Sequence, residues 1–142
     1  MNKTLLLSCM ALSVALLAGG APTSPPPTTL LQYLLLDLRE AQEKLSDVSE
    51  RMKKYELYIP SNARSIADLQ CFTKELHPVA KALKYESKEA QHIQDHIRNI
   101  NVTVNSLMGA ATAQCQYAVK IKIRGFFGEW ITFCQRLIQL TR

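Results

Sequence analysis

Apolar residues recur at intervals of three and four along four separate stretches of the chain. This interval keeps side chains on one face of an α-helix, so each stretch predicts a helix that buries one stripe. The first stripe comprises Leu31, Leu34, Leu38, Ala41, Leu45 and Val48. The second follows Asp68, a favourable N-cap residue, and comprises Leu69, Phe72, Leu76, Val79 and Leu83.

The third predicted helix runs from about Glu89 to Leu107, with inward residues Ile93, Ile97, Ile100, Val104 and Leu107. A linker rich in glycine and alanine, from Gly109 to Ala113, should end it. The fourth runs from about Phe126 to Leu140, with inward residues Phe127, Trp130, Ile131, Cys134, Leu137 and Ile138. Pro78 lies inside the second helix and should kink it, because proline removes one backbone donor.

The lengths of the connections predict the topology. The first connection, residues 49–67, is long enough to travel the length of a bundle, and Pro60 to Asn62 supply its turn signals. The second is only a few residues long. The third, from Met108 to about Gly125, is long again, and Val119 to Arg124 alternates apolar and basic residues as a short strand would. Two long crossovers around one short turn predict an all-α, up-up-down-down four-helix bundle.

Residues 1–20 have the features of a secretory signal peptide. Lys3 precedes an apolar run that ends in Ala18, Gly19 and Gly20. The run is short for a membrane anchor, and no other stretch is apolar enough to cross a bilayer. We therefore expect a secreted, extracellular protein: an extended leader over residues 21–29, then one domain that reaches residue 142. Thr23 and Asn101 are candidate glycan acceptors.

The net charge is +5, from 17 Lys and Arg against 12 Asp and Glu. These charges are scattered, whereas a nucleic-acid-binding protein usually gathers basic residues into a stripe with aromatics between them. We expect no nucleic-acid partner and no membrane insertion. The basic excess would serve solubility and weak affinity for anionic glycans, and we expect a monomer.

Three cysteines follow the signal peptide, an odd number for an oxidising compartment. Cys71 lies off the inner stripe of the second helix, and Cys115 lies in the third connection, which must cross over. Cys134 lies on the inward face of the fourth helix. We therefore predict a Cys71–Cys115 disulfide and a free, buried thiol at Cys134.

The sequence contains no phosphate-binding glycine loop, nucleophile elbow or zinc-protease motif, so we expect no enzyme activity. Glu40 and Glu43 are paired acids on a helix face that should be solvated. His92 and His96 are four residues apart, which alone is a weak metal signal. We expect them to be solvated, with no metal or cofactor bound.

Several residues opposite the stripes are unusual for solvated positions. Tyr33, Leu36 and Asp37 flank the first stripe, and Asp95, Asn99 and Val102 share one outward face of the third helix. The first connection adds Tyr55, Leu57, Tyr58 and Ile59 beside Arg51, and aromatics with arginine are typical of interfaces. From pattern alone, each set could equally be ordinary surface or loop packing.

Five strings resemble the interleukin-2 family of short-chain cytokines, in order and at similar spacing. They are APTS at residues 21–24, LLLDL at 34–38, LQC at 69–71, NINV at 99–102 and WITFCQ at 130–135. The resemblance spans nearly the whole chain. It implies a cytokine that drives lymphocyte growth and immune regulation through alpha, beta and common gamma receptor chains, and a disulfide between Cys71 and Cys115.

The resemblance also implies three receptor surfaces. The alpha-chain surface would comprise Arg51, Tyr55, Tyr58, Glu75, Val79 and Tyr85. The beta-chain surface would comprise Tyr33, Leu36, Asp37, Asp95, Asn99 and Val102. The gamma-chain surface would comprise Gln135, Ile138 and Gln139. The chain departs from the family pattern at Tyr55, Glu56 and Lys74, which bear on alpha-chain affinity, and at Gly125 and Gly128, which are poor helix formers.

Two alternatives remain at this point. One is a relative in the same cytokine class with different receptors. The other is a cationic host-defence protein whose helices disrupt membranes. The long apolar stripes argue against the second, because such helices bury their apolar faces against one another.

Overall fold

A computed structural model describes residues 25–141, so the predicted signal peptide and Thr23 lie outside the described residues. The longer elements are the helices α2 (Pro27–Lys44), α4 (Leu69–Leu83), α5 (Lys88–Met108) and α6 (Ile123–Thr141). The shorter ones are η1 (Leu45–Asp47), α3 (Glu50–Lys53), β1 (Glu56–Pro60), η2 (Ile66–Asp68) and β2 (Tyr117–Lys122).

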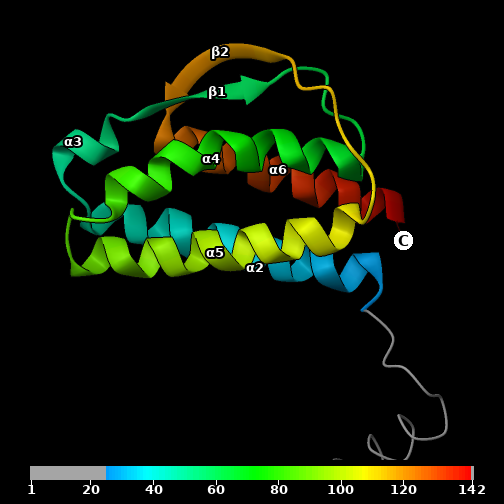
Figure 1. Ribbon diagram of the computed structural model, residues 1–142, viewed down its shortest axis with the longest axis horizontal. Helices are drawn as coiled ribbons and strands as arrows, with labels where there is room; N and C mark the ends of the chain where they lie inside the picture. Colours follow the sequence, from blue (N-terminus) through cyan, green and yellow to red (C-terminus); the bar gives the residue numbers. More distant parts are fainter. Residues whose placement is uncertain (1–24, 142) are drawn as a thin grey trace, which may run out of the picture.

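The four long helices form one bundle with the predicted topology. In Figure 1, α2 and α4 run in one direction and α5 and α6 in the other. The long crossovers between α2 and α4 and between α5 and α6 pass over the same side of the bundle. The up-up-down-down arrangement is therefore confirmed.

The two crossovers pair with each other as a short antiparallel sheet. Leu57 of β1 lies opposite Ile121 of β2, and Tyr58 lies opposite Lys120. The predicted strand at Val119 to Arg124 exists but is shifted, because Ile123 and Arg124 already belong to α6. Strand β1 and helix α3 were not predicted. Leu57 is buried and fastens the sheet to the bundle.

The core confirms the predicted stripes of all four helices with two partial exceptions. Leu107 and Ile131 are only partly buried, whereas Phe126 and Phe133, which were not predicted inward, are buried. The aromatic side chains gather between α4 and α6. Phe72 lies with its ring centroid 5.1 Å from Trp130, 5.6 Å from Phe133 and 5.7 Å from Phe126.

The helix ends follow local chemistry. Helix α2 starts at Pro27, so the predicted leader, which extended to residue 29, is too long. Proline is favoured at the first helical position because the backbone N–H that it lacks would have no partner there. The Ser87 hydroxyl accepts the Ala90 amide at the start of α5, and Gly109 ends α5 with a φ of +57°. Helix α4 is one continuous helix, with Pro78 exposed on its outer side.

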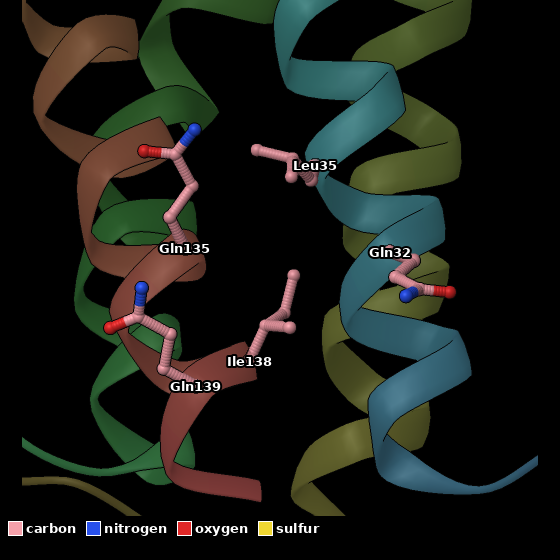
Figure 2. Close-up of a pocket in the computed structure, with 5 residues that line it drawn as sticks. All are labelled: Gln32, Leu35, Gln135, Ile138 and Gln139. Carbon is pink, nitrogen blue, oxygen red and sulfur yellow. The ribbon is translucent and has the colours of Figure 1, made fainter. Parts of the chain in front are cut away.

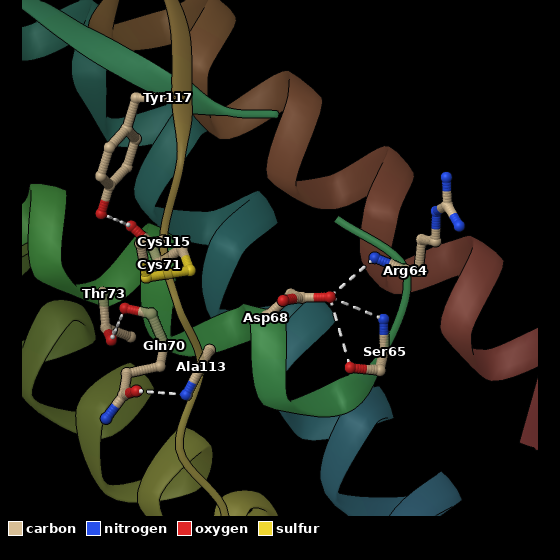
Figure 3. Close-up of a disulfide and its surroundings, with 9 residues drawn as sticks. All are labelled: Arg64, Ser65, Asp68, Gln70, Cys71, Thr73, Ala113, Cys115 and Tyr117. Carbon is tan, nitrogen blue, oxygen red and sulfur yellow. Dashed lines mark hydrogen bonds between the residues drawn. A yellow bond between two sulfur atoms is a disulfide. The ribbon is translucent and has the colours of Figure 1, made fainter. Parts of the chain in front are cut away.

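Asp68 was predicted as an N-cap, but its carboxylate has a different role. It accepts the backbone N–H groups of Arg64 and Ser65 at 2.8 and 3.0 Å, and closes a capping box with Ser65 at the start of η2 (Figure 3). Burial would raise the pKa of Asp68, but the hydrogen bonds from Arg64 and Ser65 outweigh that effect and lower it.

The predicted disulfide is present and fixes the second crossover to α4. Cys71 and Cys115 are bonded, with their Cα atoms 5.4 Å apart. Two hydrogen bonds flank it in Figure 3: the Tyr117 hydroxyl donates to the Cys71 carbonyl, and the Ala113 amide donates to the Gln70 side chain. Cys134 is free and fully buried, as predicted.

Candidate functional site

Helices α2 and α5 present one exposed face that carries all six residues predicted for the beta-chain surface. Three are large apolar side chains in solvent: Tyr33 is 54% exposed, Leu36 57% and Val102 61%. The polar members are Asp37, Asp95 and Asn99. We call this set of six residues the α2–α5 face. The three residues on α5 lie beside the three on α2 because these two helices pack against each other along their length.

Asp37, in the α2–α5 face, contacts His96 of α5. Its Oδ1 lies 3.0 Å from His96 Nδ1, and Glu40 Oε2 lies 3.4 Å from His96 Nε2. The side chain of His96 is only 15% exposed, so the ring fills the joint between the helices. Both His96 and Glu40 were predicted to be solvated. Their contact could not be predicted because α2 and α5 are far apart in the sequence.

The residues predicted for the gamma-chain surface line a groove between α2 and α6. Its volume is about 450 Å³, and its lining is Gln32, Leu35, Gln135, Ile138 and Gln139. In Figure 2, Leu35 and Ile138 point into the space between the helices, while the side chains of Gln135 and Gln139 run along α6 and do not reach into that space. We call this the α2–α6 groove. Gln32 and Leu35 were not predicted, although Leu35 stands in the LLLDL string.

The residues predicted for the alpha-chain surface lie around β1. Arg51 forms an ion pair of 2.8 Å with Glu86, which follows α4. The backbone N–H of Tyr58 donates to Glu75, also at 2.8 Å, and the Lys120 ammonium lies 4.9 Å from the centre of the Tyr58 ring. We call Arg51, Tyr55, Tyr58, Glu75 and Tyr85 the β1 face.

Val79 does not belong to the β1 face. It is fully buried on the inner side of α4, where the periodicity of the second stripe had already placed it. The assignment by resemblance was therefore wrong at this position. Tyr85, by contrast, is 88% exposed, and Tyr55 is half-buried against the core.

Two titratable groups near these surfaces have raised pKa values. Burial raises the pKa of the Cys134 thiol to about 12, which keeps it protonated and unreactive in the folded chain. The pKa of the Tyr117 hydroxyl is raised mainly by burial and secondly by the charge of Glu75. The hydroxyl therefore keeps its proton and donates a hydrogen bond to the Cys71 carbonyl.

Asn101 lines a second groove between α4 and α5, together with His77, Ala80, Lys81, Lys84, Gln94, Ile97 and Arg98. Asn101 is partly exposed there. On α5 it faces the α4 side, away from Asp95 and Asn99 on the α2–α5 face.

The described residues contain one group of three side chains that could hold a metal ion: Asp37, Glu40 and His96. His92 is exposed and is not part of it. Between residues 25 and 141, no helix is long and apolar enough to cross a membrane.

Comparison with known proteins adds an independent line of evidence. A family model described as Interleukin 2 matches residues 7–139. The chain is 37% identical to interleukin-2 of Oryctolagus cuniculus over 97% of both chains. It is 38% identical to interleukin-2 of Macaca fascicularis and to that of Homo sapiens, again over 97% of each chain.

Proposed function

Because the chain belongs to the interleukin-2 family, and is therefore a cytokine and not an enzyme, we propose that it is secreted and drives T-cell growth through alpha, beta and common gamma receptor chains. The fold and the family fit a signalling protein that binds cytokine receptors. The identity of the three chains and the residues that bind each are the proposal.

The observation that carries the proposal is the α2–α5 face. Tyr33, Leu36 and Val102 are three of the seven large apolar side chains that are exposed among the described residues. They share this face with Asp37, whose side chain is one-fifth exposed. Apolar and aromatic side chains around a partly desolvated charge are typical of the energetic centre of a protein interface. We assign this face to the beta chain.

Helix α2 gives the proposal a mechanism. It packs against both α5 and α6, so it contributes Leu36 and Asp37 to the α2–α5 face and Gln32 and Leu35 to the α2–α6 groove. A beta chain on the face and a gamma chain in the groove would be neighbours on either side of one helix. The packed core fixes that spacing, and the cytokine would signal by holding the two chains together.

We assign the β1 face to the alpha chain. Strand β1 lies on the crossover side of the bundle, away from α2, so an alpha chain bound around it would leave the other two sites open (Figure 1). Tyr58 and Tyr85 would be its aromatic anchors, with Arg51 contributing charge.

The test is Asp37→Lys, measured by binding to purified alpha, beta and gamma ectodomains. A reversed charge should leave the bundle folded, because Asp37 lies outside the core, and it should abolish beta-chain binding, because it places an unpaired charge in the interface. Glu129→Lys is the matched control, since Glu129 is an exposed acid of α6 outside all three surfaces. Equal beta-chain affinity of both variants would refute the assignment.

A further inference from the structure

His96 lies between two carboxylates, one at each ring nitrogen. Nδ1 is 3.0 Å from Asp37 Oδ1, and Nε2 is 3.4 Å from Glu40 Oε2. Asp37 and Glu40 are three residues apart on α2, which places them on the same side of that helix. His96 reaches them from α5, so the cluster joins two elements that pack tightly.

A neutral imidazole cannot satisfy both contacts. It carries one N–H donor and one lone pair, so one nitrogen donates to a carboxylate while the other turns its lone pair toward the second carboxylate. In the tautomer that donates from Nδ1 to Asp37, the shorter contact, the Nε2 lone pair faces Glu40. Nε2 and Glu40 Oε2 are then two electron-pair donors 3.4 Å apart, placed as two ligands of one cation would be.

The surroundings do not supply that cation from a side chain. Within residues 25–141, neither Asp37 nor Glu40 forms an ion pair with a lysine or an arginine. The one potential ligand atom on each of the three residues lies within 4.8 Å of the other two. Glu40 is 47% exposed, which leaves the cluster a path to solvent.

We propose that Asp37, Glu40 and His96 form a zinc site, with His96 Nε2 and Glu40 as direct ligands and Asp37 holding the ring through Nδ1–H. Neutral imidazole and carboxylate are ordinary zinc ligands, and a carboxylate behind a ligating histidine is the usual means of fixing its tautomer and orientation. The two carboxylate charges balance the charge of the ion. Water completes the coordination on the exposed side.

The site has a consequence that rests on the proposed function. Asp37 is the charged centre of the α2–α5 face, and Glu40 follows it by one turn. An ion held there neutralises the charge that a beta chain would pair with, and its bound water occupies the surface. Zinc should therefore weaken beta-chain binding and leave alpha-chain binding at the distant β1 face unchanged.

The site is tested by titrating zinc chloride into the full folded chain at pH 7.4 in a calorimeter. We expect one saturable site that magnesium chloride does not fill. His96→Leu and Glu40→Gln should lose it, and Asp37→Asn should bind about 10–100-fold more weakly. His92→Leu, an exposed histidine one turn away on α5, is the matched control and should bind as the parent does. Circular dichroism verifies that each variant is folded.

The outcomes separate the two claims. Parental zinc affinity in folded His96→Leu, or loss of the site in His92→Leu, would overturn the metal site. Beta-ectodomain affinity is then compared with and without saturating zinc. A loss in the parent that is absent in His96→Leu supports competition, and equal affinity in the parent overturns it. If the beta ectodomain binds under neither condition, the proposed receptor fails while the calorimetric result still decides the zinc site.

Discussion

The ring of Phe72 on α4 stacks on Trp130 of α6, with centroids 5.1 Å apart and planes inclined by 17°. Phe127, three residues earlier on α6, also stacks on Trp130, with the ring centroids 6.4 Å apart. The joint between α4 and α6 is thus filled by large rings. Yet the indole Nε1 of Trp130 is buried without a hydrogen-bond partner, the single side-chain atom of that kind in the described part of the chain.

This arrangement predicts unequal costs for two substitutions in the stack. Phe72→Ala should lower the free energy of unfolding by roughly 3–5 kcal/mol, because it leaves a cavity beside three rings. Trp130→Phe should cost less than about 2 kcal/mol, because removing an unpaired buried N–H, worth about 1–3 kcal/mol, offsets part of the lost packing. Urea unfolding measures both, and equal costs would contradict this account of Trp130.

The capping box predicts a contribution to stability that depends on pH. The folded-state pKa of Asp68 is lowered below 3.8, because the amide hydrogen bonds from Arg64 and Ser65 outweigh the effect of burial. As pH falls, Asp68 therefore becomes protonated in the unfolded chain before it does so in the folded chain. Its contribution to the free energy of unfolding is complete above the unfolded-state pKa and disappears as pH falls through the folded-state pKa. Asp68→Ala should cost about 1 kcal/mol at pH 7 and much less near pH 2. A constant difference across this range would contradict the mechanism.

Burial of Cys134 predicts protection of its thiol. With a pKa of about 12 in the folded chain, the thiol stays protonated at pH 8 and should react with iodoacetamide only as fast as the chain unfolds. The contribution of this group to stability is complete below the unfolded pKa, near 9, and is lost as pH rises toward 12. Cys134→Ala should remove that alkaline loss. Rapid alkylation of the folded parent would show that the thiol is accessible.

Two glycines predict opposite responses to alanine. Gly128 lies inside α6, and a Cβ there would meet only Gln42 Nε2, at an ordinary contact distance of 3.4 Å. Gly128→Ala should therefore stabilise the chain by up to about 1 kcal/mol through helix propensity. Gly109 has a φ of +57°, so Gly109→Ala should destabilise it by about 1 kcal/mol or more, although no atom is near. Thermal unfolding of the two variants gives the comparison.

The sequence predicted the helices well because their information is local. Every residue of the first stripe is buried, and the connection lengths alone gave the topology. Strand β1 was missed because its pairing partner, β2, follows only after η2, α4 and α5, and a five-residue segment ending in Pro60 has no periodicity of its own. The Asp37–His96 contact was missed for the same reason: a helical wheel for α2 cannot show what α5 brings to it.

The predicted surfaces depended on resemblance, and one error shows its limit. Val79 was placed on a receptor surface by position in the family and in the core by the stripe of α4, and the structure puts it in the core. Where position in a family and helical periodicity conflict, burial follows periodicity, because it reflects the packing of the helix itself.

The α2–α6 groove supplies the last prediction. Ile138 is almost fully buried, so replacing it would damage packing and binding together. Gln135 is exposed, and its side chain runs along α6 at the edge of the groove (Figure 2). Gln135→Asp shortens an exposed side chain by one methylene and adds a charge to a surface that is otherwise neutral among the five lining residues.

We expect Gln135→Asp to retain the fold and the binding of alpha and beta ectodomains but to lose gamma-chain binding. The proposed mechanism requires two receptor chains on one cytokine, so this variant should occupy the beta chain unproductively and compete with the parent as an antagonist. The measurement is phosphorylation of the downstream transcription factor in responsive cells, with ectodomain binding alongside. Gln114→Asp, the same substitution at an exposed site in the second crossover, should signal as the parent does. Full signalling by Gln135→Asp would show that the gamma chain binds elsewhere, because the added charge would then lie outside the contact.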